Sequence, residues 1–372
     1  MNKSYRMPLL LPVLAGLIAL AGCERPDTTE SAQTGFRGTG MEQVTNTRRT
    51  GALALTNVVP AALDPVEPGG PLASDLYQNV QVLGDLTITE FNRLMSAMTE
   101  WVSPEEGCNY CHVPGNFASE DIYTKIVSRR MLEMTYVINN QWETHVGDTG
   151  VTCYTCHQGA PVPSYVWFEE RDGPAQAGGM AASRRGQNLA AASVGSSSLP
   201  SDPFSAFLLG EEEIRSIPTT ALPAGTNPRN IMDTEWTYGL MIHFSNALGV
   251  NCTYCHNTRS FMSWDNSPPQ RTTAWHGIRM VRELNQDYLD PLQPVYPDSQ
   301  LSFHGDAPKT NCATCHQGLA KPLYGANMRA AYPELEAIRL VGSPRPATEP
   351  ASVAATATVV ESEELEAEPE AL

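Results

Sequence analysis

The sequence carries Cys108-Asn-Tyr-Cys111-His112 and repeats this Cys-x-x-Cys-His spacing three more times. The later copies are Cys153-Tyr-Thr-Cys156-His157, Cys252-Thr-Tyr-Cys255-His256 and Cys312-Ala-Thr-Cys315-His316. The four copies are called motifs 1 to 4 in chain order. Two thiols at this spacing can bond the vinyl carbons along one edge of a haem, and the next histidine then reaches the iron. A structural zinc site or a disulfide framework would not require that histidine each time. The motifs use eight of the nine cysteines and predict four covalently bound haem c groups.

The ninth cysteine, Cys23, follows a short apolar segment. Two basic residues precede a mostly apolar run from residue 7 to residue 20, which is typical of a secretory signal. The run is short for a membrane-spanning helix, which needs about 20 residues. It ends in Leu20-Ala21-Gly22-Cys23, which resembles a bacterial lipoprotein cleavage site. We expect a signal peptide at 1–22 and lipid on Cys23; an uncleaved helical anchor is the alternative.

The composition is acidic, with a net charge of −17. This charge argues against a nucleic-acid partner and favours a basic soluble partner through electrostatic steering. Residues 344–372 are rich in Ala, Glu and Pro, with too few large apolar residues to fold, and we predict a disordered acidic tail. Residues 173–203 are rich in Gly, Ala and Ser, which predicts a linker or a long surface connection.

These boundaries divide the chain into two halves with two motifs each. We predict a lipidated, extended N-terminal segment at 23–74, in which 24–50 is irregular. A half at 75–172 holds the haem pair of motifs 1 and 2, and a half at 204–343 holds the pair of motifs 3 and 4. The expected fold is that of a multihaem cytochrome c, mainly α with much irregular structure. The chain has 28 Gly and 29 Pro but only nine Phe, which is little apolar surface for a globular protein. The porphyrins would supply the missing apolar surface of the cores.

A haem that only transfers electrons has both axial positions filled, by His and by Met or a second His. Three helices with methionines on their apolar faces are predicted upstream of motifs 1 to 3. The first, at about 88–101, starts with a capping-box pattern at Thr87 and Glu90. The second, at about 120–142, has Ser119 as a plausible N-cap, and the third lies at about 231–248. Their ligand candidates are Met95 or Met98, Met131 or Met134, and Met241.

The sixth ligand of the fourth haem is not settled by spacing. A helix predicted near 272–288 offers His276 and Met280, which lie far before Cys312. His304 lies eight residues before Cys312, and His145 lies eight residues before Cys153. Either of these two histidines could complete a bis-His haem.

The chain resembles the tetrahaem cytochrome c subunit of the purple-bacterial photosynthetic reaction centre from Cys23 to about residue 340. The resemblance rests on the motifs and on several further stretches. These are Tyr77-Gln-Asn-Val-Gln-Val-Leu, Trp101-Val-Ser-Pro-Glu-Glu-Gly, Tyr123-Thr-Lys-Ile-Val-Ser-Arg-Arg-Met131, Arg271-Thr-Thr-Ala-Trp and Lys321-Pro-Leu-Tyr-Gly.

The resemblance implies an axial ligand pair for each haem. The pairs are Met95 with His112, Met131 with His157, Met241 with His256, and His145 with His316. His304 is then a surface or propionate-side residue. The resemblance also implies two haem pairs related by a local twofold axis. Because Met raises the potential relative to His, the fourth haem should be the lowest or near-lowest.

The function implied is electron delivery, not enzymatic catalysis. The protein would be lipid-anchored at the periplasmic face of the inner photosynthetic membrane, on L- and M-type subunits. It would re-reduce their photo-oxidised special pair and be refilled by a soluble cytochrome c or a high-potential iron–sulfur protein. The alternatives are a multihaem reductase, a free periplasmic carrier or a subunit feeding another membrane complex. Four arginines are candidates for neutralising haem propionates: Arg259, Arg271, Arg279 and Arg282.

Overall fold

A computed structural model describes residues 28–35, 41–169, 191–216 and 231–340. The expected signal peptide, Cys23, the acidic tail and most of the expected 173–203 connection lie outside these ranges. No helix in the described ranges is long and apolar enough to cross a membrane.

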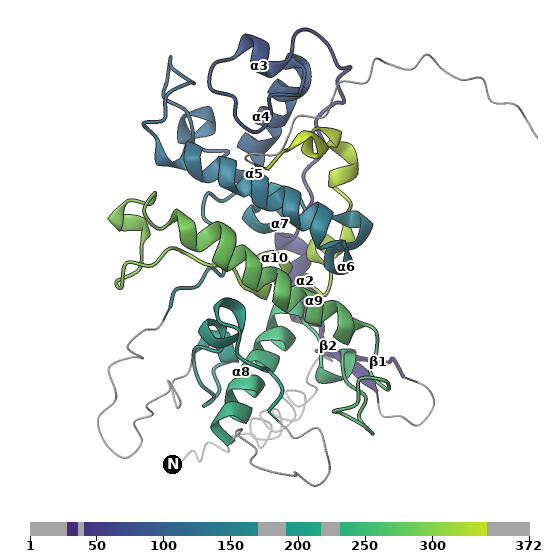
Figure 1. Cartoon of the computed structure of the whole chain (residues 1–372). Helices are drawn as coiled ribbons and strands as arrows, with labels where there is room; N and C mark the ends of the chain where they lie inside the picture. The colour runs from purple at the N-terminus through teal and green to yellow at the C-terminus, as the bar shows by residue number, and fades with distance from the viewer. Residues whose placement is uncertain (1–27, 36–40, 170–190, 217–230, 341–372) are drawn as a thin grey trace, which may run out of the picture. The chain divides into compact units, whose positions relative to one another are not determined.

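Helices and irregular segments make up most of the described structure, as expected (Figure 1). The long helices are α4 (Ile88–Val102), α5 (Tyr123–Gln141), α8 (Ile231–Leu248) and α9 (Gln270–Glu283). The short helices are α2 (Thr47–Thr56), α3 (Ala73–Leu76), α6 (Glu143–Val146), α7 (Cys153–His157) and α10 (Cys312–His316). The sheet in this part of the chain is one antiparallel hairpin of β1 (Thr29–Gln33) and β2 (Glu42–Asn46).

The helix starts follow local hydrogen bonding. The capping box predicted for α4 is present, because the Thr87 N–H donates to Glu90 Oε2 over 3.0 Å. The start predicted for α5 was wrong, since Ile122 and not Ser119 is its N-cap. The Ser119 hydroxyl instead accepts from the Asp121 N–H in a turn before the helix. The helix predicted near 272–288 ends as α9 at Glu283 and continues as one π-helical turn, Leu284–Leu289.

The N-terminal segment is more ordered than we expected. The extended segment predicted at 23–74, irregular over 24–50, contains the β1–β2 hairpin and α2. The Asn46 side chain starts α2 by accepting from the N–H groups of Arg48 and Arg49 at 3.0 and 3.2 Å. Both strands are largely exposed, so they lack the strict alternation of apolar residues that identifies a strand.

The connection predicted at 173–203 is packed where it is described. Val194 and Ser201 are buried, and the 3-10 turn Ala192–Val194 lies on α8. Gly239 of α8 faces this turn, because a Cβ added there would lie 3.3 Å from Val194 Cγ1. Residues 191–203 thus combine buried positions with exposed ones such as Gly195 and Ser196.

Two apolar cores each combine residues from both sides of the connection. The first includes Val137 of α5, Leu208, Leu240 of α8 and Leu284. The second includes Leu94 and Trp101 of α4 together with Leu335 and Ile338. The segments that hold motifs 1 and 2 and those that hold motifs 3 and 4 thus share both cores.

Two buried cations also join distant segments. Lys309 is fully buried, and its Nζ lies 3.0 Å from Asp306, 3.2 Å from Asp290 and 3.4 Å from Glu169. Arg93 of α4 lies 2.6 Å from the buried Glu334 carboxylate. The Arg93 guanidinium also donates to three backbone carbonyls and stacks on the Tyr332 ring.

Replacing Arg93 should destabilise the protein strongly. Arg93→Met removes the partner of a buried carboxylate, which typically costs about 3–5 kcal/mol. Arg329→Met is the matched control, because its partner Glu336 is 68% exposed and 3.7 Å away. An exposed pair contributes about 0–1 kcal/mol. Denaturant unfolding of the haem-loaded protein measures both, and equal losses would contradict the prediction.

Candidate haem-binding site

The histidine of each motif is held by a backbone carbonyl a few residues downstream. His112 Nδ1 lies 3.1 Å from Phe117 O, and His256 Nδ1 lies 2.8 Å from Phe261 O. The other two bonds, each 2.9 Å long, join His157 Nδ1 to Ala160 O and His316 Nδ1 to Leu319 O. An Nδ1–H that donates to a carbonyl leaves the Nε2 lone pair free for a metal and fixes the ring orientation.

The motifs fall into two local geometries. Motifs 1 and 3 each contain a 3-10 turn, Gly107–Tyr110 and Cys252–Tyr254, and their histidine bonds a carbonyl five residues on. Motifs 2 and 4 each form one helical turn, α7 and α10, and their histidine bonds a carbonyl three residues on. The first geometry is thus shared by motifs 1 and 3, and the second by motifs 2 and 4.

Two buried asparagines hold the chain ahead of motifs 2 and 4 in the same way. Asn139 Nδ2 donates to Val151 O over 3.0 Å, and its Oδ1 accepts from the Val151 N–H over 2.7 Å. Asn285 makes the same two bonds to Thr310, at 3.0 and 2.8 Å. Val151 and Thr310 each lie two residues before the first cysteine of their motif. Asn139 and Asn285 therefore occupy corresponding positions ahead of motifs 2 and 4.

The helices α4 and α8 are equivalent by the same reasoning. Gly159, just after motif 2, donates its N–H to Trp101 O of α4, and Gly318, just after motif 4, donates to Ala247 O of α8. Both bonds are 2.8 Å long. The same number of residues separates Trp101 from Ala247 as separates Asn139 from Asn285.

That common offset also relates the candidate ligands. It carries Met95 of α4 onto Met241 of α8, two residues predicted to be axial ligands. Both are half-buried and pack against the two apolar cores. By the same offset, Met131 of α5 corresponds to Gly277 of α9. Gly277 has no side chain and so cannot be an axial ligand.

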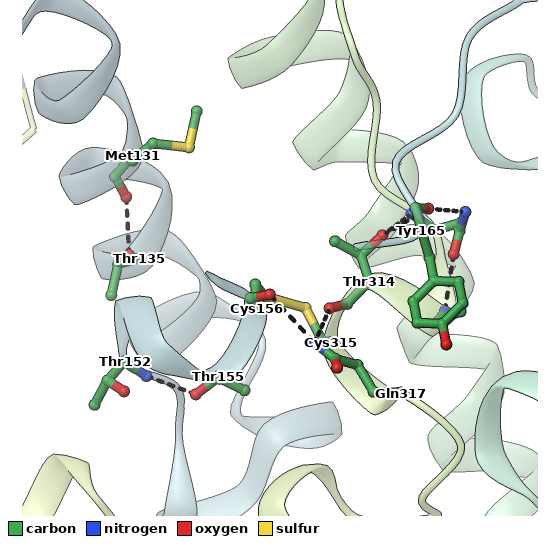
Figure 2. Close-up of a disulfide and its surroundings, with 11 residues drawn as sticks. Met131, Thr135, Thr152, Thr155, Cys156, Tyr165, Thr314, Cys315 and Gln317 are labelled. Carbon is green, nitrogen blue, oxygen red and sulfur yellow. Dashed lines mark hydrogen bonds between the residues drawn. A yellow bond between two sulfur atoms is a disulfide. The ribbon is translucent and has the colours of Figure 1, made fainter. Parts of the chain in front are cut away.

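A mainly apolar cavity lies beside motif 2. It has about 1190 Å³ of empty volume, part of it open to solvent, and Cys153, Cys156 and His157 line it. Met131 also lines it and extends its thioether away from α5 (Figure 2). Apolar walls with a few convergent polar ligands suit a macrocycle that is flat and apolar. Met98 and Met134 line the same cavity, so lining alone does not separate Met131 from Met134.

The structure brings His145 beside His316 of motif 4. The two ring centroids lie 6.0 Å apart, and the planes cross at 68°. His145 Nδ1 lies 2.9 Å from Thr273 O of α9, which leaves its Nε2 available. Burial lowers the pKa of His145 and lowers the pKa of His316 to about 4, so both rings are neutral at physiological pH. His304, the alternative candidate, lies in an exposed turn beside the Phe303 ring.

Motifs 2 and 4 touch each other through their second cysteines. Cys156 and Cys315 form a disulfide with a Cα–Cα distance of 4.4 Å (Figure 2). Gln317 Nε2 also donates to Cys156 O over 3.3 Å. A sulfur in this disulfide cannot carry a thioether, so the disulfide and haem attachment at these two cysteines exclude each other. The other six motif cysteines are free thiols: Cys108, Cys111, Cys153, Cys252, Cys255 and Cys312.

The candidate arginines make contacts within the protein. Arg271 stacks on Trp264 and donates to Ser263 O over 2.9 Å. Arg279 stacks on Trp275. Arg282 donates to Phe207 O over 3.1 Å. The Arg259 N–H donates to Asn257 Oδ1 over 3.0 Å in the turn after motif 3.

Sequence reasoning missed one buried histidine, His243 on α8. Its ring packs edge-on against Phe204 with 4.5 Å between centroids, and its Nε2 is buried without a hydrogen-bond partner. Burial lowers its pKa to about 3. Its repeat equivalent is Ala97, and because His243 lies within an apolar helical pattern, spacing gives no signal for it.

The sequence matches the photosynthetic reaction centre cytochrome C subunit family over residues 24–336. It is 49% identical to the photosynthetic reaction center cytochrome c subunit of Rubrivivax gelatinosus over 361 residues, or 97% of this chain and 94% of that protein. The protein of the same name in Thermochromatium tepidum is 47% identical, over 96% of this chain and 87% of that protein. The one from Roseobacter denitrificans is 42% identical, over 86% and 89%. The chain therefore belongs to the reaction-centre cytochrome c subunit family.

Proposed function

We propose that this chain binds four c-type haems and returns electrons to the photo-oxidised special pair of a photosynthetic reaction centre. Membership of the family makes the chain an electron carrier with covalent c-type haem, not an enzyme. The observation that carries the count of four is the anchoring of every motif histidine through Nδ1. Bound haem supplies a one-electron redox couple, and the protein supplies ligands, burial and spacing.

The sixth ligands follow from the repeat and from the contacts. We assign Met131 to the haem of His157: both line one cavity, and the family resemblance selects Met131 over Met134. We assign Met95 to the haem of His112 and Met241 to the haem of His256, because these methionines occupy equivalent positions on α4 and α8. We assign His145 to the haem of His316, because the centroids of the two rings lie 6.0 Å apart.

The two haem pairs would lie in equivalent halves, 75–172 and 204–343. The support is the shared local geometry of motifs 1 and 3 and of motifs 2 and 4. The paired amide bonds of Asn139 and Asn285 support it independently. In this arrangement the haems of motifs 2 and 4 are neighbours, because Cys156 and Cys315 are adjacent.

The haem of motif 3 would lie toward the membrane. The β1–β2 hairpin contacts this motif, since Thr253 Oγ1 donates to Glu42 O over 2.7 Å and the Asn251 N–H donates to Gln43 Oε1 over 3.1 Å. Cys23 is only six residues before Thr29, the first residue of β1. Six residues span at most about 20 Å, so lipid on Cys23 would keep the hairpin and motif 3 near the bilayer.

The partners would be the L- and M-type membrane subunits and a soluble cytochrome c or high-potential iron–sulfur protein, at the periplasmic face. The net charge of −17 favours a basic donor. A multihaem reductase is the second candidate, but it needs an open iron position. Here each motif histidine has a candidate sixth ligand.

Isolation from native membranes tests the partner assignment. The chain should co-purify with the L- and M-type subunits, and a flash should oxidise a haem as the special pair recovers. A preparation that lacks those subunits, or in which flashes leave the haems reduced, would refute the proposal.

Intact-mass measurement tests the lipid anchor. We expect the mature chain to begin at Cys23 with an acyl-glycerol adduct. Cys23→Ser should lose this adduct, because the substitution removes the thiol that carries the lipid. A wild-type chain that begins at Met1 would contradict this prediction.

Exchange of one histidine tests the ligand of the fourth haem. His145→Met should raise the potential of the lowest-potential haem, because axial ligand identity moves haem potentials within a range of roughly 0.8 V. The other three haems should change little, and the bis-His band in near-infrared magnetic circular dichroism should disappear. His304→Met is the control and should move none of them. The assignment fails if the low-potential haem responds to the change at 304 instead.

A further inference from the structure

We propose that Gly277 determines the ligand type of the fourth haem, by leaving open the space that the His145 imidazole occupies. This inference rests on the proposed haem ligation, and it adds Gly277, a residue outside the four motifs.

The structural repeat identifies the position. Asn139 and Asn285 make the same pair of backbone bonds, and eight residues before them lie Met131 and Gly277. The residues that follow in α5 and α9 also correspond, for Leu132 and Ile278 are both buried apolar residues. Gly277 therefore stands where the first half has its proposed thioether ligand.

The backbone does not require glycine at this position. Gly277 lies inside α9, and its φ is not in the left-handed region. Glycine inside a helix is less stable than alanine by about 0.5–1 kcal/mol. Since conformation gives no reason for glycine, the reason must be the space around the residue.

His145 fills that space. A Cβ added to Gly277 would lie 2.5 Å from His145 Cε1, 2.8 Å from Nδ1 and 3.1 Å from Nε2. The first two distances are too short for any real contact, so even alanine would displace the ring. The Thr273 carbonyl, one helical turn earlier, receives the His145 Nδ1–H over 2.9 Å and fixes the ring over this gap.

The two halves thus supply their ligands differently. In the first half a side chain of α5 itself points into the cavity of motif 2. In the second half α9 supplies a gap and a carbonyl, and α6, which packs against α9, supplies the imidazole. The residue at this position is Met131 in the first half and Gly277 in the second. Its identity therefore determines whether a thioether or an imidazole is the sixth ligand.

The test begins with Gly277→Ala in the full-length, haem-loaded protein. We expect near-infrared magnetic circular dichroism to lose the bis-His signal, which belongs to one of the four haems, and a high-spin signal of equal size to appear. The three His–Met haems should keep their spectra and potentials. Gly51→Ala is the matched control, because Gly51 is also helical and a Cβ there would meet nothing within 4 Å. An intact bis-His signal in Gly277→Ala would overturn the proposal.

A second variant covers the possibility that Gly277→Ala binds less haem. The double variant His145→Ala/Gly277→Met should regain a low-spin His–Met haem, whereas His145→Ala alone should keep a high-spin haem. Haem content by pyridine haemochrome is measured for both. If the double variant stays high-spin with four haems bound, Gly277 does not set the ligand. If the wild type has no bis-His haem, the ligand assignment itself is wrong, which is a distinct result.

Discussion

Two buried side-chain amides organise this protein. Asn139 and Asn285 each satisfy both the N–H and the C=O of the residue two places before a motif. Removal of either amide would leave two buried backbone groups unpaired, at about 1–3 kcal/mol each. These bonds fix the distance between a long helix and the motif turn that follows it. Because the first amide holds α5 to α7 and the second holds the continuation of α9 to α10, the repeat depends on them.

Burial keeps the histidines of motifs 2 and 4 uncharged. His157 and His316 lie in apolar surroundings that lower their pKa values, and backbone carbonyls occupy their Nδ1 atoms. A folded-state pKa below the unfolded one means that the folded protein is least stable at low pH, where these rings would have to be protonated. Around neutral pH the rings stay uncharged and their Nε2 atoms remain available. The same surroundings raise the pKa of the Cys153 and Cys312 thiols to about 12.

Local sequence signals predicted the long helices well and the tertiary contacts poorly. The Thr87–Glu90 capping box predicted where α4 begins, because that signal is complete within one helical turn. The β1–β2 hairpin was missed, because its polar, exposed strands lack a core-facing pattern. Spacing could not choose between His145 and His304, since both lie eight residues before a motif. The contact of His145 with Gly277 joins α6 to α9. These residues are far apart in the sequence, so only the tertiary structure reveals the contact.

The adjacency of Cys156 and Cys315 has a consequence for biosynthesis. Before cofactor insertion, an oxidising compartment can link these thiols, which leaves each motif with one sulfur for attachment. A thioether formed first at either cysteine removes the partner and protects the other thiol. In the proposed periplasmic location, attachment of haem at both motifs would therefore require these two thiols to be kept reduced until one of them is occupied.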